Sequence, residues 1–288
     1  MDWISNFKCR CSAIVKALAD SRSNPQLTPN QAGLIIEYES RTKPPTENQK
    51  KEYARLLVLR ENSSKVVLSD GYIDYLMEVY SWETEGMIPI GKESMDLMQM
   101  RKGKECETEG RMLLSAVDGE VYKVHKERIF NDYLSGEVDF YLGESIYKAT
   151  NVTDCKNAFD YPTYLKKVNK GLENGQREQL QGYGDITSAQ DLFVANCLIS
   201  FSPDMVMDMK YKVMRKLNCA TEESPEFLEE WPKWEKSMFF DKIDQHKRVF
   251  KIKVEPFTKE EQQKIYDRVK YGRDFLWEFD EKYQKMNL

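Results

Sequence analysis

The sequence lacks the features that identify several common classes of protein. No apolar run approaches the roughly 20 residues that a membrane-spanning helix needs. The beginning of the chain has a short apolar centre but no small-residue cleavage site, so we expect no secretory signal and a cytoplasmic location. We also find no internal repeat and no low-complexity linker.

Histidines and paired cysteines are scarce. With only His125 and His246 present, no Ser-His-Asp or Cys-His arrangement can be read from the sequence. None of the six cysteines forms a C-x-x-C pair, so we expect no structural zinc and interpret them as free thiols of a reducing compartment. The cysteines are scattered along the chain: Cys9, Cys11, Cys106, Cys155, Cys197 and Cys219.

The chain has no excess of positive charge. Its net charge is -5 and its pI is about 5.4, which taken alone argues against nucleic-acid binding. Residues 41–65 differ from the rest, because seven basic residues minus three acidic ones leave a local charge of +4. A charged run is most often a solvated face, so this segment permits DNA binding without demonstrating it.

What is present indicates an ordinary globular protein of 288 residues, 41% of them hydrophobic. Helical spacing of apolar residues dominates residues 1–90 and continues over 92–117, where an interruption is expected near Gly103. Later segments are predicted in order as strands at 120–127, 130–143 and 145–156, a helix at 177–199, strands at 204–213 and 248–257, and a helix at 259–285. This order favours an α/β or α+β core with a helical N-terminal elaboration.

Residues 135–156 bring acidic and basic side chains together in a predicted hairpin. Asp154 and Lys156 share one face of a strand, and Cys155 points to the opposite face. Asp139 belongs to the preceding strand, predicted over residues 135–142. A turn at Gly143-Glu144 cannot pair Asp139 directly with Asp154 unless the second strand is longer, but it brings both to one region of the sheet.

Clustered carboxylates repel one another and persist where a cation neutralises them. Oxygen ligands in small number suit Mg²⁺ or Mn²⁺. A nearby lysine can orient an attacking water or stabilise charge on a phosphate. The alternative is that these are ordinary polar residues at strand ends, and an isolated Asp-x-Lys triplet favours that alternative because such triplets are common.

Two further motifs flank the hairpin. A Gly-x-x-x-Glu runs from Gly103 to Glu107, and a Gln-x-x-x-Tyr runs from Gln179 to Tyr183. With the Gly-x-x-Asp that ends at Asp139 and the Asp-x-Lys, four motifs occur in order over residues 103–183. In this order they resemble the PD-(D/E)xK nuclease superfamily, and within it the RecB-like and YqaJ-type phage exonucleases, the group that includes lambda exonuclease.

The resemblance implies a role for each motif residue. Glu107, Asp139 and Asp154 would hold one or two Mg²⁺ or Mn²⁺ ions, with the backbone carbonyl of Cys155 as a further ligand. Lys156 would position or activate the water. The remaining two residues, Gln179 and Tyr183, would steady the site and contact the DNA backbone.

The resemblance also implies a fold and an activity. We expect a restriction-endonuclease-like mixed sheet flanked by helices, in a single nuclease domain with a helical part (1–90), a catalytic core (91–215) and a C-terminal strand and helix (216–288). The expected function is a metal-dependent DNA exonuclease of phage recombination or DNA processing, located in the host cytoplasm if phage-encoded.

Linear double-stranded DNA would be the substrate, and a homo-oligomer and a single-strand annealing protein are the further partners that the resemblance suggests. Some relatives bind an iron–sulfur cluster through late cysteines, but Cys219 is the only late cysteine here, so no cluster is expected. Two alternatives stay open: a structure-specific or restriction-type endonuclease, and an inactive DNA-binding member of the fold.

Overall fold

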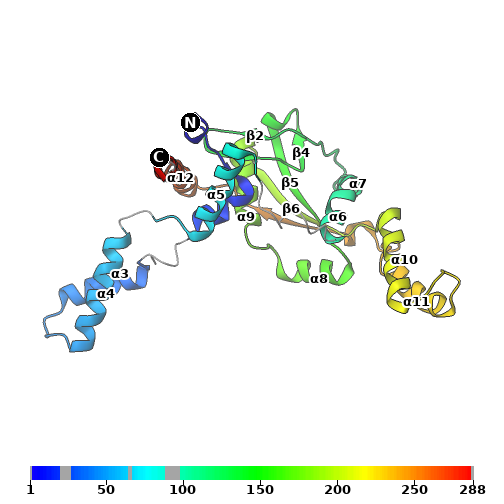
Figure 1. The fold of residues 1–288 in the computed structure, drawn as a ribbon, viewed down its shortest axis with the longest axis horizontal. Coiled ribbons are helices and arrows are strands. Elements are labelled where there is room, and N and C mark those ends of the chain that lie inside the picture. The colour runs from blue at the N-terminus through cyan, green and yellow to red at the C-terminus, as the bar shows by residue number, and fades with distance from the viewer. Residues whose placement is uncertain (1, 20–26, 64–66, 88–97, 287–288) are drawn as a thin grey trace. The chain divides into compact units, whose positions relative to one another are not determined.

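A computed structural model describes residues 2–19, 27–63, 67–87 and 98–286. The chain divides into two compact units (Figure 1). The terminal unit is built from both ends of the chain, within residues 1–9, 13–88 and 259–288. The central unit comprises residues 10–12 and 89–258 and includes the four motifs.

Helices make up the terminal unit. Its buried core joins segments far apart in sequence: the Tyr80 hydroxyl donates to Asp280 Oδ1 at 2.6 Å, and Arg273 donates to the Phe7 carbonyl. The described helices of this unit are α1 (Asp2–Ser5), α2 (Ile14–Leu18), α3 (Pro29–Ser40), α4 (Glu47–Ser63), α5 (Asp70–Glu85) and α12 (Lys259–Met286).

Helices α3 and α4 pack against each other as a helical hairpin with a small core of its own. Thr28 begins α3 with a capping box, in which its side chain accepts from Gln31 N–H while the Gln31 side chain accepts from Thr28 N–H. Between the two helices, Ile35, Leu56 and Leu59 are buried. The helical expectation for the described part of residues 1–90 is therefore confirmed.

A four-stranded mixed sheet forms the core of the central unit. Its order is β4-β5-β6-β7, and the β5–β6 pair is parallel while the two outer pairs are antiparallel. The strands are β4 (Phe140–Gly143), β5 (Ala149–Asn157), β6 (Asp191–Cys197) and β7 (Val249–Val254). This mixed sheet flanked by helices confirms the expected fold class.

Helices cover both faces of this sheet. On one face, α7 (Glu107–Asp118) packs with Cys155, Ala195 and Cys197, and its Gly110 lies so close that an added Cβ would approach Cys155 Sγ to 3.3 Å. On the other face, α9 (Gln176–Thr187) lies against Leu192. Because alternate residues of a strand face opposite sides, both faces of β6 are apolar.

Shorter elements complete the described part of the central unit. Strands β2 (Ile129–Phe130) and β3 (Leu134–Gly136) pair antiparallel and belong to a second sheet of order β1-β3-β2, with β1 at Cys9–Arg10. The other described helices are η1 (Cys11–Ala13), α6 (Met98–Glu105), η2 (Ile146–Lys148), α8 (Tyr161–Lys170), α10 (Pro203–Leu217), α11 (Pro225–Lys236) and η3 (Gln245–Lys247).

Residues 204–213, predicted as a strand, lie in α10, so that prediction is wrong. Ser202 caps this helix by accepting from Met205 N–H, and Pro203 occupies its first turn. The apolar residues follow helical spacing rather than alternation, since Met205 and Val213 are buried together with Phe227 and Trp231 of α11.

Two further expectations are corrected. The helix predicted over residues 177–199 ends at Thr187, and β6 follows after Ser188 takes a left-handed conformation with φ 62°. Residues 120–127 form no strand; only Lys123 makes an isolated bridge, to Tyr141. Among the described helices, none combines the length and apolar character that crossing a bilayer requires.

Candidate active site

The register of β4 and β5 places Asp139 beside Asp154. Phe140 pairs with Thr153 in the antiparallel register. Asp139, one residue before Phe140, therefore lies opposite Asp154, one residue after Thr153. Direct opposition is possible because β5 is nine residues long and the connection is not a tight turn at Gly143 but includes η2. The predicted strand over 135–142 is also corrected: it is divided between β3 and β4, and Asp139 immediately precedes β4.

Hydrogen bonds hold this acidic pair in place. Asp139 Oδ2 accepts from the backbone N–H of Cys155 at 2.9 Å, and Asp154 Oδ1 accepts from Lys156 Nζ at 2.9 Å. Asp154 is only 1% exposed. Its second oxygen, Oδ2, is buried and has no hydrogen-bond partner among the described residues. A carboxylate oxygen buried in this way is costly unless a donor or a cation reaches it.

The electrostatics of the pair follow from burial and proximity. Burial, followed by repulsion from Asp154, raises the pKa of Asp139 to about 7, although Lys156 and the Cys155 N–H oppose the shift. Burial by itself lowers the pKa of Lys156, but the attraction of Asp154 and Asp139 outweighs it, so the pKa of Lys156 is raised. The lysine is therefore a cation at neutral pH.

Cys155 faces away from the two acids. Its Sγ lies 3.7 Å from Cys197 Sγ on the face that α7 covers. Its backbone N–H points to the Asp139 side of β5, and the N–H and C=O of one strand residue point to the same side. The Cys155 carbonyl therefore faces the edge of the sheet where Asp139 lies.

The Gln-x-x-x-Tyr motif joins the same site from α9. Gln179 Nε2 donates to the Tyr183 hydroxyl at 2.8 Å. Burial, together with repulsion from Asp154, raises the pKa of Tyr183, so the phenol stays protonated. The ring lies against Gly136, where an added Cβ would come within 2.5 Å of Tyr183 Cε1. The glycine of the Gly-x-x-Asp motif thus leaves the space that the Tyr183 ring occupies, because any side chain at this position would clash with the ring.

Glu107 is not brought into this cluster. It is exposed at the first position of α7, and within the described residues no three His, Cys, Asp or Glu side chains converge as a metal-binding group. The carboxylates that do meet are Asp139 and Asp154. The proposed metal role of Glu107 stays a prediction.

Asn157 is a structural residue of the site that the motif pattern did not include. Its Nδ2 donates to the carbonyls of Cys106 at 3.0 Å and Gly103 at 3.4 Å. It therefore ties the junction of α6 and α7 to the end of β5. Its position in the sequence could have indicated this role. Asn157 lies two residues after Cys155, so the two side chains share the face of β5 that α7 covers.

No protein-family model and no curated protein matches this sequence. Solved structures do match. A phage-related exonuclease from Haemophilus somnus 129PT has a TM-score of 0.56 at 17% identity, covering 98% of this chain and 99% of that chain.

An alkaline exonuclease from Laribacter hongkongensis matches with a TM-score of 0.53 at 10% identity, covering 99% of this chain and 98% of that chain. A structure of the same protein in complex with dAMP matches with a TM-score of 0.51 at 11% identity and the same coverage. The chain thus has the fold that its motifs indicate, over almost its whole length.

Proposed function

We propose that this protein is a divalent-metal-dependent deoxyribonuclease of the YqaJ-type exonuclease group, and that it hydrolyses DNA phosphodiester bonds at the Asp139–Asp154 pair. The observation that carries the proposal is the convergence of Asp139, Asp154 and the Lys156 ammonium, together with one buried carboxylate oxygen that lacks a partner. The fold shared with solved exonucleases supports it.

The residues present fit a small hard cation. Mg²⁺ is commonly held by one or two carboxylates, with water and substrate phosphate completing its octahedron. Asp139 and Asp154 supply the carboxylates, the Cys155 carbonyl faces the same edge, and the unpartnered Asp154 Oδ2 is a ready ligand. We infer Mg²⁺ or Mn²⁺ at this pair of carboxylates. Glu107, which lies outside the cluster, stays a predicted ligand. When bound, the ion supplies an activated water and neutralises charge on the phosphate.

Lys156 contributes positive charge to the site. Asp154 and Asp139 raise its pKa, so the amine is protonated when no other cation neutralises the two aspartates. The ammonium orients Asp154 through the 2.9 Å hydrogen bond and offers positive charge to a phosphate. Of the two roles that the motif suggests, this hydrogen bond supports positioning.

Gln179 and Tyr183 hold the α9 side of the site. The hydroxyl of Tyr183 accepts from Gln179, so its own proton remains available for a DNA phosphate oxygen. Since the tyrosine is 5% exposed, any such contact comes from its hydroxyl edge. We therefore propose that Tyr183 acts by positioning and that Gln179 fixes the direction of its hydroxyl.

Linear duplex DNA is the proposed substrate, and phage-type recombination or DNA processing in the cytoplasm is the proposed setting. A homo-oligomer and a single-strand annealing partner remain part of this proposal. The intact acids and lysine disfavour an inactive DNA-binding member. An endonuclease would use the same groups, because the chemistry at the phosphate does not depend on whether the DNA has an end.

Substrate topology separates the two nuclease activities. With Mg²⁺, the purified protein should degrade end-labelled linear duplex and leave covalently closed circles intact. Rapid cutting of closed circles would replace the exonuclease proposal by the endonuclease alternative. No cleavage of either substrate, with Mg²⁺ or Mn²⁺, would contradict the nuclease proposal as a whole.

A further inference from the structure

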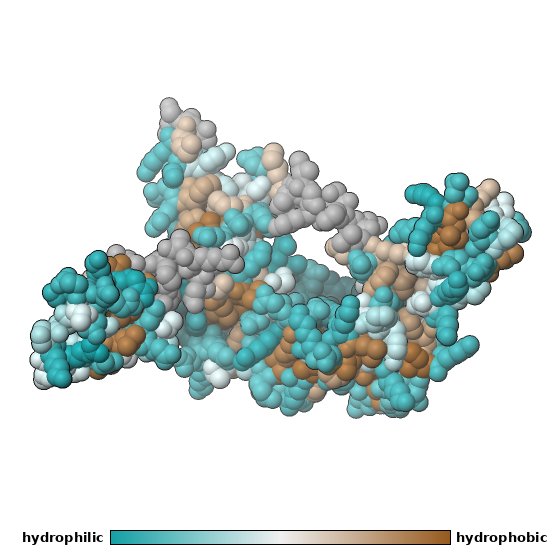
Figure 2. All heavy atoms as spheres, turned by 90° about the horizontal axis from the view of Figure 1, so that it is seen from below, coloured by the Kyte–Doolittle hydropathy of each residue, from teal (hydrophilic) through white to brown (hydrophobic). Residues whose placement is uncertain are grey.

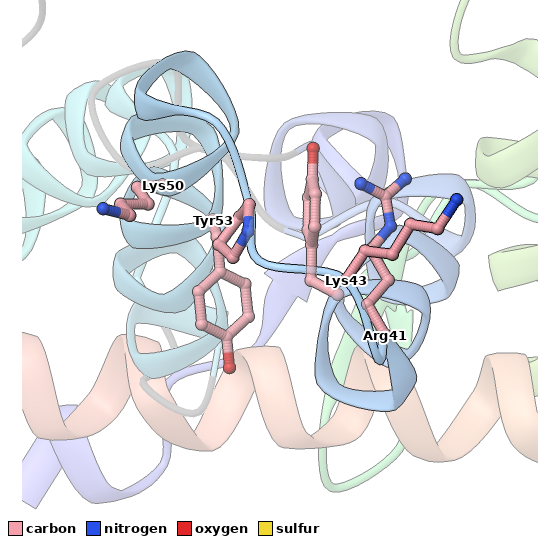
Figure 3. A pocket seen from close by; sticks show the side chains of 6 residues that line it. Arg41, Lys43, Lys50 and Tyr53 are labelled. Carbon is pink, nitrogen blue, oxygen red and sulfur yellow. The ribbon is translucent and has the colours of Figure 1, made fainter.

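A second candidate site lies on the α3–α4 hairpin of the terminal unit. A cavity of about 180 Å³ opens where the two helices are joined. Lys50 and Tyr53 come from α4, while Arg41 and Lys43 come from the segment that follows α3 (Figure 3). The cavity is lined by Tyr38, Arg41, Lys43, Pro45, Lys50 and Tyr53.

Two tyrosines form an aromatic platform in this cavity. The rings of Tyr38 and Tyr53 meet edge to face, with centroids 5.6 Å apart, and Arg41 lies over Tyr38 at 5.0 Å from its centroid. Both rings are half-buried and pack on the core between the helices. The platform is therefore fixed by the fold of the hairpin while part of each ring remains accessible.

The charge at the cavity is positive. Its lining includes three cations and no acid, and hydrophilic residues cover most of the hairpin face seen at the left of Figure 2. Lys43 makes no ion pair or hydrogen bond within the described residues. Arg41 pairs with Glu37 at 2.5 Å and Lys50 pairs with Glu47 at 2.7 Å, but all four side chains are at least 34% exposed. Such exposed pairs are weak, so a phosphate can compete for both cations.

We propose that this cavity binds single-stranded DNA, with one base against the Tyr38–Tyr53 platform and the neighbouring phosphates on Arg41, Lys43 and Lys50. The size supports one ring: about 180 Å³ is well below the roughly 300–1,000 Å³ of sites that enclose a whole small molecule. Stacking needs an exposed base face, which a single strand offers and an intact duplex does not. The choice of DNA over RNA rests on the proposed function.

The chemistry distinguishes this partner from an acidic protein. Carboxylates would satisfy the three cations but would leave the aromatic platform unused. A nucleic-acid strand uses both, because every base has a π-face and every linkage has a phosphate. The joining segment also carries Pro44 and Pro45, whose fixed φ reduces the conformational freedom that binding would otherwise remove.

The test is fluorescence anisotropy of a labelled oligo-dT with the full chain in EDTA, over a range of salt. In Arg41→Gln/Lys43→Gln/Lys50→Gln, the negative slope of log affinity against log salt should decrease in magnitude by about 2, since each single-strand phosphate contact contributes about 0.7. Lys51→Gln is the matched control, because Lys51 is exposed on α4 and lies outside the cavity. An unchanged slope in the triple variant, or an equal loss in Lys51→Gln, overturns the proposal.

The aromatic platform has a separate signature. Tyr38→Leu should weaken binding about fivefold or more with the salt slope unchanged, whereas Tyr38→Phe should bind like the parent protein. Thermal unfolding checks that each variant is folded, and competition by polyglutamate against the parent protein tests stacking if Leu loosens the hairpin. Base stacking is contradicted if Tyr38→Phe and Tyr38→Leu weaken binding equally. It is also contradicted if polyglutamate displaces the labelled oligonucleotide as readily as unlabelled oligo-dT does.

The outcome is separable from that of the nuclease proposal. EDTA removes metal-dependent cleavage, so binding is measured without it. If Asp154→Asn retained full nuclease activity, the proposed active site would fail while the binding data would still stand. If the hairpin variants had the affinity and salt dependence of the parent protein for oligo-dT, the hairpin proposal would fail. The proposal that Asp154 belongs to the nuclease active site would be unaffected.

Discussion

Replacing Gly136 by alanine tests how the Gly-x-x-Asp and Gln-x-x-x-Tyr motifs fit together. An alanine Cβ at this position would lie 2.5 Å from Tyr183 Cε1 and 3.0 Å from Tyr183 Cδ1, far inside ordinary contact distance. The ring has little room to yield, because Tyr183 is 5% exposed and its hydroxyl is held by Gln179. Overpacking of this kind typically costs about 1–3 kcal/mol.

The expected result is therefore a loss of both stability and activity. Gly136→Ala should lower the Tm by several degrees, at about 2–4 °C per kcal/mol for a chain of this size class. Nuclease activity should fall as well, since a displaced ring moves the hydroxyl that Gln179 holds and that senses the charge of Asp154. Gly103→Ala is the matched control from another motif: its added Cβ meets nothing within 4 Å, and alanine favours the helix by about 0.5–1 kcal/mol.

A double-mutant cycle assigns the cost to the ring. In a Tyr183→Ala background the nearest obstacle is gone, so Gly136→Ala should cost much less than in the parent protein. A small cost should persist because Cys11 Sγ lies 3.1 Å from the added Cβ. Equal costs in the two backgrounds, or a Gly136→Ala variant as stable as Gly103→Ala, would refute the argument from packing.

Two further predictions concern metal and pH. Saturating Mg²⁺ should raise the Tm of the parent protein, with about 2.7 kcal/mol of stabilisation at 100 times the Kd, and should leave Asp154→Asn unchanged in a thermal-shift assay; equal shifts in both would contradict the metal site. Burial lowers the pKa of Lys102 to about 8, below its ordinary 10.5, so the native state binds fewer protons than the unfolded state between these values. Stability relative to Lys102→Met should accordingly rise from pH 8 to pH 10.5, by about 3 kcal/mol at 1.36 kcal/mol per pKa unit, as urea titrations at the two pH values would measure; a flat difference would contradict it.

The arrangement of the candidate site residues along β5 could be predicted from sequence because strand alternation is a local property. Alternation along β5 places Asp154 with Lys156 and turns Cys155 to the other face, and the structure has this arrangement. The direct opposition of Asp139 and Asp154 was not predictable, because it depends on the length of β5. That length is stabilised by the parallel pairing of β5 with β6, in which each paired residue of β5 lies opposite the residue 40 positions later in the sequence.

The errors in secondary structure also have physical causes. Nothing local separates α9 from β6, because the break occurs at Ser188, a non-glycine residue held at φ 62°. The misassigned α10 did carry a usable signal, since Ser202 followed by Pro203 is a common helix start. Its alternating Met205, Met207 and Met209 resemble a strand pattern. In the structure only Met205 and Met209 pack in the cluster of Phe227 and Trp231, and Met207 is exposed.

Cleavage of linear duplex DNA by the parent protein and by two site variants is the most direct test of the central claim. Released acid-soluble nucleotide would be measured in Mg²⁺, after circular dichroism has shown that each variant is folded. The account predicts that Asp154→Asn is nearly inactive and that Lys156→Gln is slower by about 100-fold, the scale of one lost electrostatic donor. Parent-level activity in Asp154→Asn would contradict the account.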